Sequence, residues 1–292
     1  MRIAVTSHTA IDQIESRGSS FVGIGGPTCY SGLTAKSLGA DVQLVTKVGR
    51  DFDYRNVLNE KGLQISDACI SASKPTTRFK IVIDGQTRNI FLLARCEDIA
   101  ADEININADA CIVSPIINEI SGDVVSEISK QVNFVFLDPQ GFVRKVRKDG
   151  RCYIKKTEMN FHRFKINAIK VDDEEALALT GAKGVDALKK LKIETAILTS
   201  GNRTTMLHKE RVYEISTEMI DIQDSTGAGD ILSGAYTYAF VNSKDAGWAL
   251  CLGVAAAFTA LRSNTRGISK IPPKKDVENY ASLLHNNIKS VT

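Results

Sequence analysis

Motifs that would assign this chain to several common classes of protein are missing. The 292 residues contain six widely scattered cysteines with no C-x-x-C pair, and the four histidines are isolated from one another. This distribution excludes a disulfide framework and a zinc site, and it is typical of reduced thiols inside a cell. The metalloprotease sequence H-E-x-x-H and the hydrolase sequence G-x-S-x-G do not occur either.

Two nucleotide-binding motifs are absent or incomplete. A P-loop requires a glycine before its lysine, and Lys36-Ser37 follows an alanine instead. The run Gly23-Ile24-Gly25-Gly26-Pro27-Thr28 begins like a dinucleotide fingerprint but has Thr28 where the third glycine belongs. An oxidoreductase therefore stays a weak alternative, and the phosphate site must be sought elsewhere.

Charge and hydropathy limit the partners. The chain carries 37 basic and 34 acidic residues, a net charge of +3 that is too balanced to predict nucleic-acid binding. The one basic cluster, residues 144–148, is interpreted as a solvated helix face or loop. The longest apolar stretch, residues 246–261, is shorter than the roughly 20 residues of a membrane-spanning helix. The N-terminus lacks the apolar segment of a secretion signal, so a cytoplasmic protein that binds no membrane is expected.

Short strand-like runs alternate with helical patterns along most of the chain. Strands are expected at residues 2–6, 41–45, 110–114, 134–138, 166–170 and 195–199. Helices are expected at residues 28–38, 55–61, 121–130, 173–179, 184–191, 230–241, 245–261 and 276–287. This alternation predicts one α/β domain spanning residues 1–292, with a mainly parallel sheet sandwiched by helices. Ligands of such folds bind at the carboxyl ends of the strands.

Two segments lack helical periodicity and predict a second, smaller sheet. Residues 79–83 and 88–92 flank Asp84-Gly85-Gln86, and Asp-Gly between such runs indicates a hairpin. Together with the region around residues 12–23, the hairpin region at about 74–94 is expected to form an antiparallel β lid over the cleft. Because exposed strands of a small sheet pair readily, a homodimer through this lid is also expected.

The most informative stretch is Asp224-Ser225-Thr226-Gly227-Ala228-Gly229-Asp230, followed at once by an amphipathic run. Its glycines allow a sharp turn with unshielded N–H groups, and the helix that follows adds its positive dipole end, so an anion site is predicted. Asp230 could be a first-turn acid that only stabilises the helix. A carboxylate beside an anion cradle is also what phosphoryl transfer to a hydroxyl requires, and we favour that interpretation.

This heptapeptide resembles the Asp-Thr-x-Gly-Ala-Gly-Asp signature of the ribokinase-like (PfkB) family of small-molecule kinases, with serine in the second place. The N-terminal half is similar in outline, with Asp12 after the first strand and then the pair Gly25-Gly26. The family's N-x-x-E sequence is matched by Asp172-Asp173-Glu174-Glu175, in which Asp172 replaces asparagine. The resemblance covers nearly the whole chain.

The resemblance implies a role for each matching residue. Asp230 would be the base that accepts the proton of the substrate hydroxyl, and the backbone N–H groups of Gly227, Ala228 and Gly229 would hold the phosphoryl group. Mg²⁺ would be held through water by Asp172 and Glu175, which could instead be acids that favour a helix N-terminus. ATP would lie along the residues Thr199, Ser200, Gly201, Thr226, Gly227, Gly229 and Asn264. Gly201 could equally be a turn glycine and Asn264 a helix C-cap. A monovalent cation beside residues 224–226 is left open.

A second resemblance narrows the class of acceptor substrate. Tyr30, after the glycine pair, and the run Asp138-Pro139-Gln140-Gly141-Phe142-Val143-Arg144 are most similar to the inositol-kinase branch, particularly its archaeal members. Asp12, Gly25, Gly26, Tyr30, Gln140 and Arg144 would then contact the hydroxyls of a sugar or cyclic polyol, with myo-inositol the best candidate. Asp12 could instead cap a turn. A nucleoside kinase of the same family is the main alternative, and a non-catalytic ligand-binding protein is a more remote one.

Overall fold

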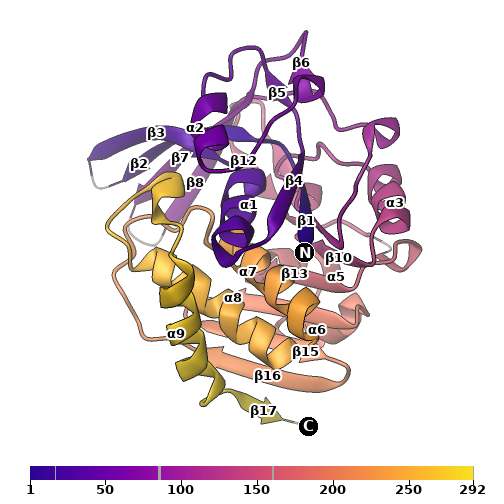
Figure 1. Cartoon of the computed structure of the whole chain (residues 1–292), viewed down its shortest axis with the longest axis vertical. Coiled ribbons are helices and arrows are strands. Elements are labelled where there is room, and N and C mark those ends of the chain that lie inside the picture. The colour runs from indigo at the N-terminus through magenta and orange to yellow at the C-terminus, as the bar shows by residue number, and fades with distance from the viewer. Residues whose placement is uncertain (17, 85–86, 160, 292) are drawn as a thin grey trace.

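The computed structural model describes residues 1–16, 18–84, 87–159 and 161–291, and two larger sheets contain most of its strands (Figure 1). The main sheet has nine strands in the order β17 (Lys289–Val291), β16 (Arg211–Ser216), β15 (Arg203–His208), β14 (Thr195–Ser200), β13 (Ala168–Asp172), β10 (Phe134–Leu137), β9 (Ala110–Val113), β1 (Arg2–Thr6) and β4 (Asp41–Val45). The strands from β14 to β4 are parallel, and β15, β16 and β17 extend one edge in antiparallel fashion. The predicted α/β class with a mainly parallel sheet is confirmed.

Helices cover both faces of this sheet because the strand side chains alternate between two apolar clusters. Ile3 and Val5 of β1 point into a core with α1 (Pro27–Leu38), α7 (Ala228–Ser243), α8 (Ala246–Leu261) and α9 (Lys274–His285). Ala4 points the other way, into a core with α3 (Gly122–Gln131), α5 (Asp173–Thr180) and α6 (Gly184–Leu191). Strands buried on both faces read as continuous apolar runs, which is why the sequence identified them.

The apolar stretch at residues 246–261 is a buried helix. Among the helices of the described ranges, none is both long and apolar enough to cross a membrane. In α8 a Cβ on Gly253 would lie 3.2 Å from the Leu232 carbonyl oxygen, so glycine allows α7 and α8 to pack closely. The shorter elements are α2 (Arg55–Glu60), α4 (Gln140–Val143), β5 (Val48–Gly49) and β6 (Ile70–Ser71), with 3₁₀ turns at Asp67–Cys69, Ala101–Glu103, Phe161–Arg163 and Gly267–Lys270.

One strand lies two residues from its expected place. The expected strand at residues 166–170 is β13, Ala168–Asp172, because Asn167 takes part in a loop instead: its Oδ1 accepts a hydrogen bond from Val135 N at 2.8 Å. The antiparallel strands β15, β16 and β17 were not expected at all. Because β13 ends two residues later than expected, Asp172 is the last residue of the strand and Lys170 lies inside the strand, near its carboxyl end.

The second sheet has the order β3 (Ser19–Gly25), β2 (Ala10–Ser16), β7 (Thr77–Asp84) and β8 (Thr87–Ala94), and it projects to one side of the main sheet (Figure 1). The pairs β2–β3 and β7–β8 are antiparallel as expected, but the central pair β2–β7 is parallel. The expectation of a wholly antiparallel sheet is therefore wrong, because both β2 and β7 leave the main body in the same direction. The expected turn residues Gly85 and Gln86 lie outside the described residues.

The basic cluster forms a hairpin rather than a helix face. Arg144 begins β11 (Arg144–Val146), which pairs with β12 (Cys152–Ile154) in antiparallel register. The hairpin continues the edge of β8, because Leu92 N donates to the Gly150 carbonyl oxygen at 2.9 Å and Arg151 donates to Asn89 Oδ1 at 2.6 Å. The helix-face interpretation of residues 144–148 is therefore wrong, and the hairpin covers one edge of the small sheet.

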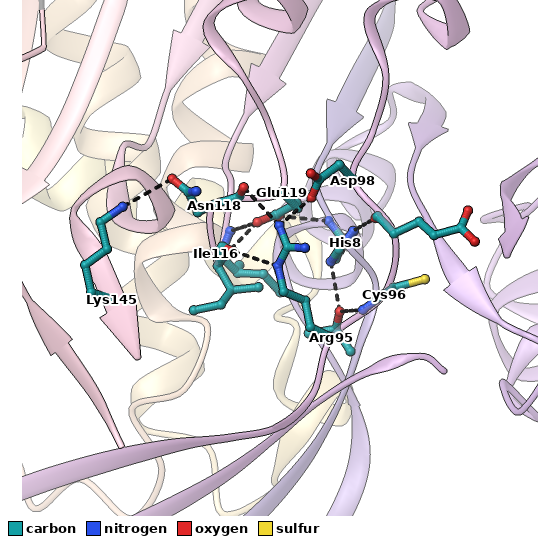
Figure 2. A network of polar contacts seen from close by, with 11 residues as sticks. His8, Arg95, Cys96, Asp98, Ile116, Asn118, Glu119 and Lys145 are labelled. Atoms are coloured by element: carbon teal, nitrogen blue, oxygen red, sulfur yellow. Dashed lines mark hydrogen bonds and ion pairs between the residues drawn. The ribbon is translucent and has the colours of Figure 1, made fainter. Parts of the chain in front are cut away.

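A buried polar network lies where the small sheet joins the main sheet (Figure 2). Glu119, in the loop after β9, is fully buried and accepts hydrogen bonds from Ile116 N at 2.8 Å and Ile117 N at 2.7 Å. It also accepts from His8 N at 3.2 Å, in the crossing from β1 to β2. One carboxylate therefore holds this crossing against the loop after β9.

His8 links the same crossing to the hairpin strands. Its Nε2 lies 2.6 Å from the Glu97 carbonyl oxygen, which can only accept, so Nε2 carries the proton. Burial lowers the pKa of His8 in spite of the nearby Glu119 charge, so the ring is neutral and Nδ1 accepts from Thr77 Oγ1 at 2.8 Å. Since Thr77 begins β7 and Glu97 follows β8, the neutral imidazole connects three of the chain crossings between the sheets.

Candidate active site

A cavity of about 220 Å³ lies between the two sheets, at the carboxyl ends of the parallel strands and the N-terminus of α7. The main body contributes polar side chains from the ends of its strands and helices. The small sheet contributes Asp12, Phe79, Ile81, Arg88 and Ile90. The site is therefore built from both sheets, and its location agrees with the rule for open α/β folds.

The heptapeptide forms the start of α7. Gly227 is the N-cap with a φ of +77°, a left-handed conformation that favours glycine, and a Cβ there would collide with the Tyr30 ring. In the part of the chain that the structure describes, the N–H groups of Gly227, Gly229 and Asp230 donate to no acceptor. The Ala228 N–H differs from expectation, because it donates to the Ser225 carbonyl oxygen at 3.3 Å. The anion cradle consists of the three remaining N–H groups and the helix dipole.

Asp230 faces the cavity beside this cradle. The N-cap of α7 is Gly227, so the carboxylate does not cap the helix, and its Oδ1 accepts instead from Gln140 Nε2 at 3.4 Å. Burial and the negative charge of Asp138 raise the pKa of Asp230 to about 7, against the opposing positive charges of Lys170, Arg88 and Arg144. A carboxylate that titrates near neutral pH is suited to accept a proton.

Gln140 and Arg144 form one hydrogen-bonded unit at the cavity. Arg144 Nη2 donates to Gln140 Oε1 at 2.9 Å and Nη1 donates to the Ile116 carbonyl oxygen at 2.7 Å. Because the amide oxygen of Gln140 is taken by the guanidinium, its NH₂ group is turned toward Asp230. Sequence reasoning placed both residues at the acceptor, and the structure brings them to the cavity together.

Asp12 and Tyr30 line the same cavity. Burial raises the pKa of Asp12 to about 7, against the attraction of Arg88. A Cβ on Gly25 would collide with the Asp12 carboxylate, so Gly25 lies behind Asp12, whereas Gly26 lines the cavity. The Tyr30 hydroxyl is buried and has no partner among the described residues, which leaves it available to a ligand.

Lys170 and Arg88 are cavity residues that sequence reasoning missed. Lys170 Nζ pairs with Asp138 Oδ2 at 2.6 Å, and a Cβ on Gly229 would lie 2.6 Å from the same ammonium. Burial lowers the pKa of Lys170, but the carboxylates of Asp138, Glu175 and Asp230 raise it above its ordinary value. A lysine inside the apolar run of β13 is the feature that could have pointed to it. Arg88 comes from β8, in a segment interpreted only as a strand.

Asp172 and Glu175 form a capping box at the start of α5. Asp172 Oδ1 accepts from Glu175 N at 2.8 Å and Glu175 Oε2 accepts from Asp172 N at 2.9 Å, so the helix-stabilising interpretation is correct. Both residues also line the cavity, and burial raises the pKa of Glu175 to about 8. Each retains a carboxylate oxygen without a hydrogen bond in the described part of the chain. Hard oxygen ligands of this kind fit Mg²⁺ held through water.

The expected donor residues are divided between two places. Thr199 and Thr226 line the first cavity, and Thr226 Oγ1 is buried with no partner in the described ranges. Gly201 lines a second cavity of about 620 Å³, which shares Arg88 and Ser225 with the first and has walls of Met219, Ile222, Phe258 and Leu261. Ser200 Oγ donates to Asp173 Oδ2 at 2.6 Å, outside both cavities. Asn264 is exposed and lines neither cavity. It is not a helix C-cap either, because the C-cap of α8 is Arg262.

The loop before the cradle holds a cation of its own. Lys270 Nζ lies 3.0 Å from Asp224 Oδ2 and donates to the Asp224 carbonyl oxygen at 3.1 Å, and Lys270 is only 2% exposed. The ammonium also lies 5.6 Å from the centre of the Tyr30 ring. Because these oxygens already bind an ammonium, they do not fit a monovalent cation as well.

An anion cradle at a helix N-terminus, a carboxylate beside it and an α/β scaffold are the features expected of a small-molecule kinase. The family model "pfkB family carbohydrate kinase" matches residues 18–272, so the chain belongs to that family. The protein is therefore a phosphotransferase with a hydroxyl group as acceptor. No curated protein matches the sequence closely enough to be compared.

Solved structures agree on the fold. A pyrophosphate-dependent kinase of the ribokinase family, complexed with a pyrophosphate analogue and myo-inositol, superposes with a TM-score of 0.80 at 21% identity, covering 94% of this chain and 99% of that one. Ribokinase from Thermotoga maritima gives 0.73 at 20% identity, covering 96% and 99%. The nucleoside kinase of Methanocaldococcus jannaschii gives 0.73 at 20% identity, covering 97% and 98%. The ribokinase-like fold is thereby confirmed.

Proposed function

We propose that this protein transfers the γ-phosphoryl group of ATP, with Mg²⁺, to a hydroxyl of a small cyclic polyol, with myo-inositol as the best candidate. The observation that carries the proposal is the position of Asp230. Its carboxylate, with a pKa of about 7, lines the same cavity as Gly227 and Gly229 at the start of α7 and as the polar side chains of Gln140 and Arg144. These are the parts that in-line transfer to an alcohol requires.

The reaction balances as a single displacement. A lone pair of the acceptor hydroxyl oxygen forms the new bond to the γ-phosphorus, and the bond to the bridging oxygen breaks with its electron pair leaving on ADP. The hydroxyl proton goes to Asp230, and the N–H groups of Gly227, Gly229 and Asp230 bind the oxygens of the group in transit. Mg²⁺ held by Asp172 and Glu175 would neutralise phosphate charge.

The acceptor side supports a polyol. Asp12, Tyr30, Gln140 and Arg144 offer hydrogen-bonding groups of both kinds, and Phe79, Ile81 and Ile90 offer apolar walls for the faces of a ring. A similar solved structure is described as holding myo-inositol, and another is a nucleoside kinase, so a nucleoside stays the second candidate. A non-catalytic binding protein has no need of a carboxylate with a raised pKa at a phosphate site.

The donor is the second part of the proposal. The structural neighbour that holds a pyrophosphate analogue uses a donor without a base. The second cavity of this chain has an apolar wall of Met219, Ile222, Phe258 and Leu261 beside Ser225 and Arg88, and an apolar wall of this kind supports a donor that carries a nucleobase. Inorganic pyrophosphate would leave that wall without a ligand.

A screen of donors against acceptors tests the proposal. Purified protein with MgCl₂ would be given ATP, ADP or pyrophosphate together with myo-inositol, ribose, fructose 6-phosphate, 2-keto-3-deoxygluconate, adenosine or cytidine. We expect the highest kcat/KM for ATP with myo-inositol. Preference for pyrophosphate would overturn the donor assignment alone, preference for adenosine or cytidine would favour the nucleoside kinase, and no turnover with any pair would overturn the proposal.

We further propose that residues 1–292 act as one domain whose small sheet is a lid. Arg88, Phe79 and Ile81 reach the cavity from that sheet, so a bound ligand contacts both parts and favours their approach. Closure would exclude water, which otherwise competes as an acceptor. Small-angle scattering is expected to give a smaller radius of gyration with both substrates than without them, and an unchanged radius would contradict the lid.

The cytoplasmic homodimer is proposed through one edge of this sheet. The edge of β8 is covered by the β11–β12 hairpin, whereas β3 pairs in the described chain only with β2 and exposes 54% of Val22. An uncovered strand is a template for pairing with a second copy. Light scattering should give twice the chain mass for the wild type and a lower mass for Val22→Lys. A wild-type monomer would contradict the dimer.

A further inference from the structure

Lys170 lies in an electrostatically unusual place. Its ammonium packs against Gly229 in the first turn of α7, where the helix dipole is positive and favours anions rather than cations. The side chain is also buried, with only 9% of it exposed. Such a cation is disfavoured by the loss of hydration and by the positive end of the helix dipole. Neighbouring negative charges must therefore compensate for it.

The compensation comes from carboxylates around the cavity. Asp138, fully buried after β10, pairs with Nζ at 2.6 Å, and Glu175 and Asp230 line the same cavity. The ion pair with Asp138 holds the ammonium at the start of α7. The cavity therefore holds an ammonium beside three N–H groups that have no acceptor in the described chain. An anion between the ammonium and the N–H groups would contact both. The proposed function places the transferred phosphoryl group at this position.

We infer that Lys170 is a catalytic residue whose ammonium binds the non-bridging oxygens of the phosphoryl group in transfer. The inference rests on the proposed function and adds a side-chain cation to its backbone cradle. Charge spreads over these oxygens in the loose transition state, so a fixed cation beside them stabilises the transition state more than the ground state. Asp138 is a positioning residue that holds the ammonium against the start of α7 until the donor binds.

The arrangement has a second consequence at Asp230. The positive charge of Lys170 lowers the pKa of the Asp230 carboxylate, which burial and Asp138 raise to about 7. Removing the ammonium should therefore raise the pKa of Asp230. The acidic limb of the kcat/KM profile would then move to higher pH. A variant that keeps the positive charge, such as Lys170→Arg, should leave this midpoint unchanged.

The test compares Lys170→Met and Lys170→Arg with Lys130→Met, a lysine on the exposed surface of α3. We expect Lys170→Met to lower kcat by about 100-fold or more, with the KM of the acceptor changed by less than about 3-fold. The acidic midpoint should rise in Lys170→Met and stay near the wild-type value in Lys170→Arg and Lys130→Met. A kcat within about 3-fold of the wild type, or an unmoved midpoint in Lys170→Met, would overturn the inference.

A measurement on the wild type covers the case in which Lys170→Met does not fold. The ¹⁵N resonance of Lys170 Nζ, assigned by its loss in Lys170→Arg, should shift when Mg²⁺ and a non-hydrolysable ATP analogue are added, and also with inorganic pyrophosphate. No shift at saturation with either anion would reject the contact. This measurement needs no turnover, so it separates the inference from the proposed function, whose failure would appear as a wild type that transfers phosphate to no acceptor.

Discussion

At the scale of single residues, Asp230 is the side chain on which the proposed chemistry depends. Asp230→Asn keeps the volume of the side chain and its contact with Gln140 but removes the base. We expect kcat to fall by about 100-fold or more, with nucleotide binding retained. Since only the ionised form accepts a proton, wild-type kcat/KM should rise with pH through about 7, the pKa of both Asp230 and Asp12. Steady-state kinetics between pH 5.5 and 8.5 would check both statements, and an unchanged kcat in the variant would reject the base.

Gly227 gives a second prediction at this scale, because a side chain there would suffer both backbone strain and a steric clash. Gly227→Ala must hold a φ of +77° and place a Cβ into the Tyr30 ring. Gly181→Ala is the matched control, with a φ of +68° and no atom within 4 Å of its Cβ. We expect the control to lose about 1 kcal/mol of unfolding free energy and no activity. Gly227→Ala should lose more stability and most of kcat/KM, as measured by urea unfolding and kinetics. Equal losses in the two variants would show that the Tyr30 contact is unimportant.

At the scale of elements, the loop before α7 depends on Lys270. Lys270→Met removes the ammonium that compensates the buried carboxylate of Asp224, and a buried charge left without its partner costs about 3–5 kcal/mol. Urea unfolding would measure this loss, with the exposed Lys274→Met as control. Because the wild type supplies its own cation, its turnover should be the same in potassium chloride and in tetramethylammonium chloride. Strong activation by potassium would contradict the assignment.

The junction between the two sheets depends on Glu119. Glu119→Gln replaces one acceptor oxygen by an NH₂ group that faces backbone donors, while the shape is kept. Loss of a buried charged hydrogen bond with an unsatisfied donor left behind costs about 3 kcal/mol. Thermal and urea unfolding would measure it, and Glu127→Gln, at a partly exposed side chain of α3 that keeps an oxygen for Gln131, should leave the midpoint unchanged. If the unfolding midpoint of Glu119→Gln also stayed unchanged, the hydrogen bonds of Glu119 would not contribute to stability.

At the scale of the whole molecule, stability should fall as pH rises from about 6.5 to 8. Burial raises the pKa values of Asp12 and Asp230 to about 7 and of Glu175 to about 8, so the folded protein retains protons there that the unfolded chain has released. The free energy of unfolding therefore decreases with rising pH in this range. Burial lowers the pKa of His8. His8 therefore affects the free energy of unfolding only below its ordinary pKa of 6.5, where unfolding takes up a proton. Urea unfolding of the ligand-free protein at several pH values would check the sign, and Asp230→Asn should reduce the slope.

Local patterns predicted much of this architecture because they depend on neighbours in the chain. The doubly buried parallel strands read as apolar runs, and the glycines around Gly227 marked a turn into a helix. The strands β15, β16 and β17 lie at the sheet edge with mixed burial, so their patterns were too weak to identify. Asn264 was assigned to the donor site from its position after a helix, and nothing local could show that the chain there faces solvent.

The sequence by itself determined the class of fold, the anion cradle and its carboxylate, because each rests on residues adjacent in the chain. Tertiary structure alone decided which distant side chains meet there. Lys170 reaches the first turn of α7 from a strand about sixty residues earlier, Arg88 arrives from the small sheet, and Lys270 neutralises Asp224. These contacts depend on strand order and on compensation between buried charges, which are properties of the packed molecule and not of any local run of residues.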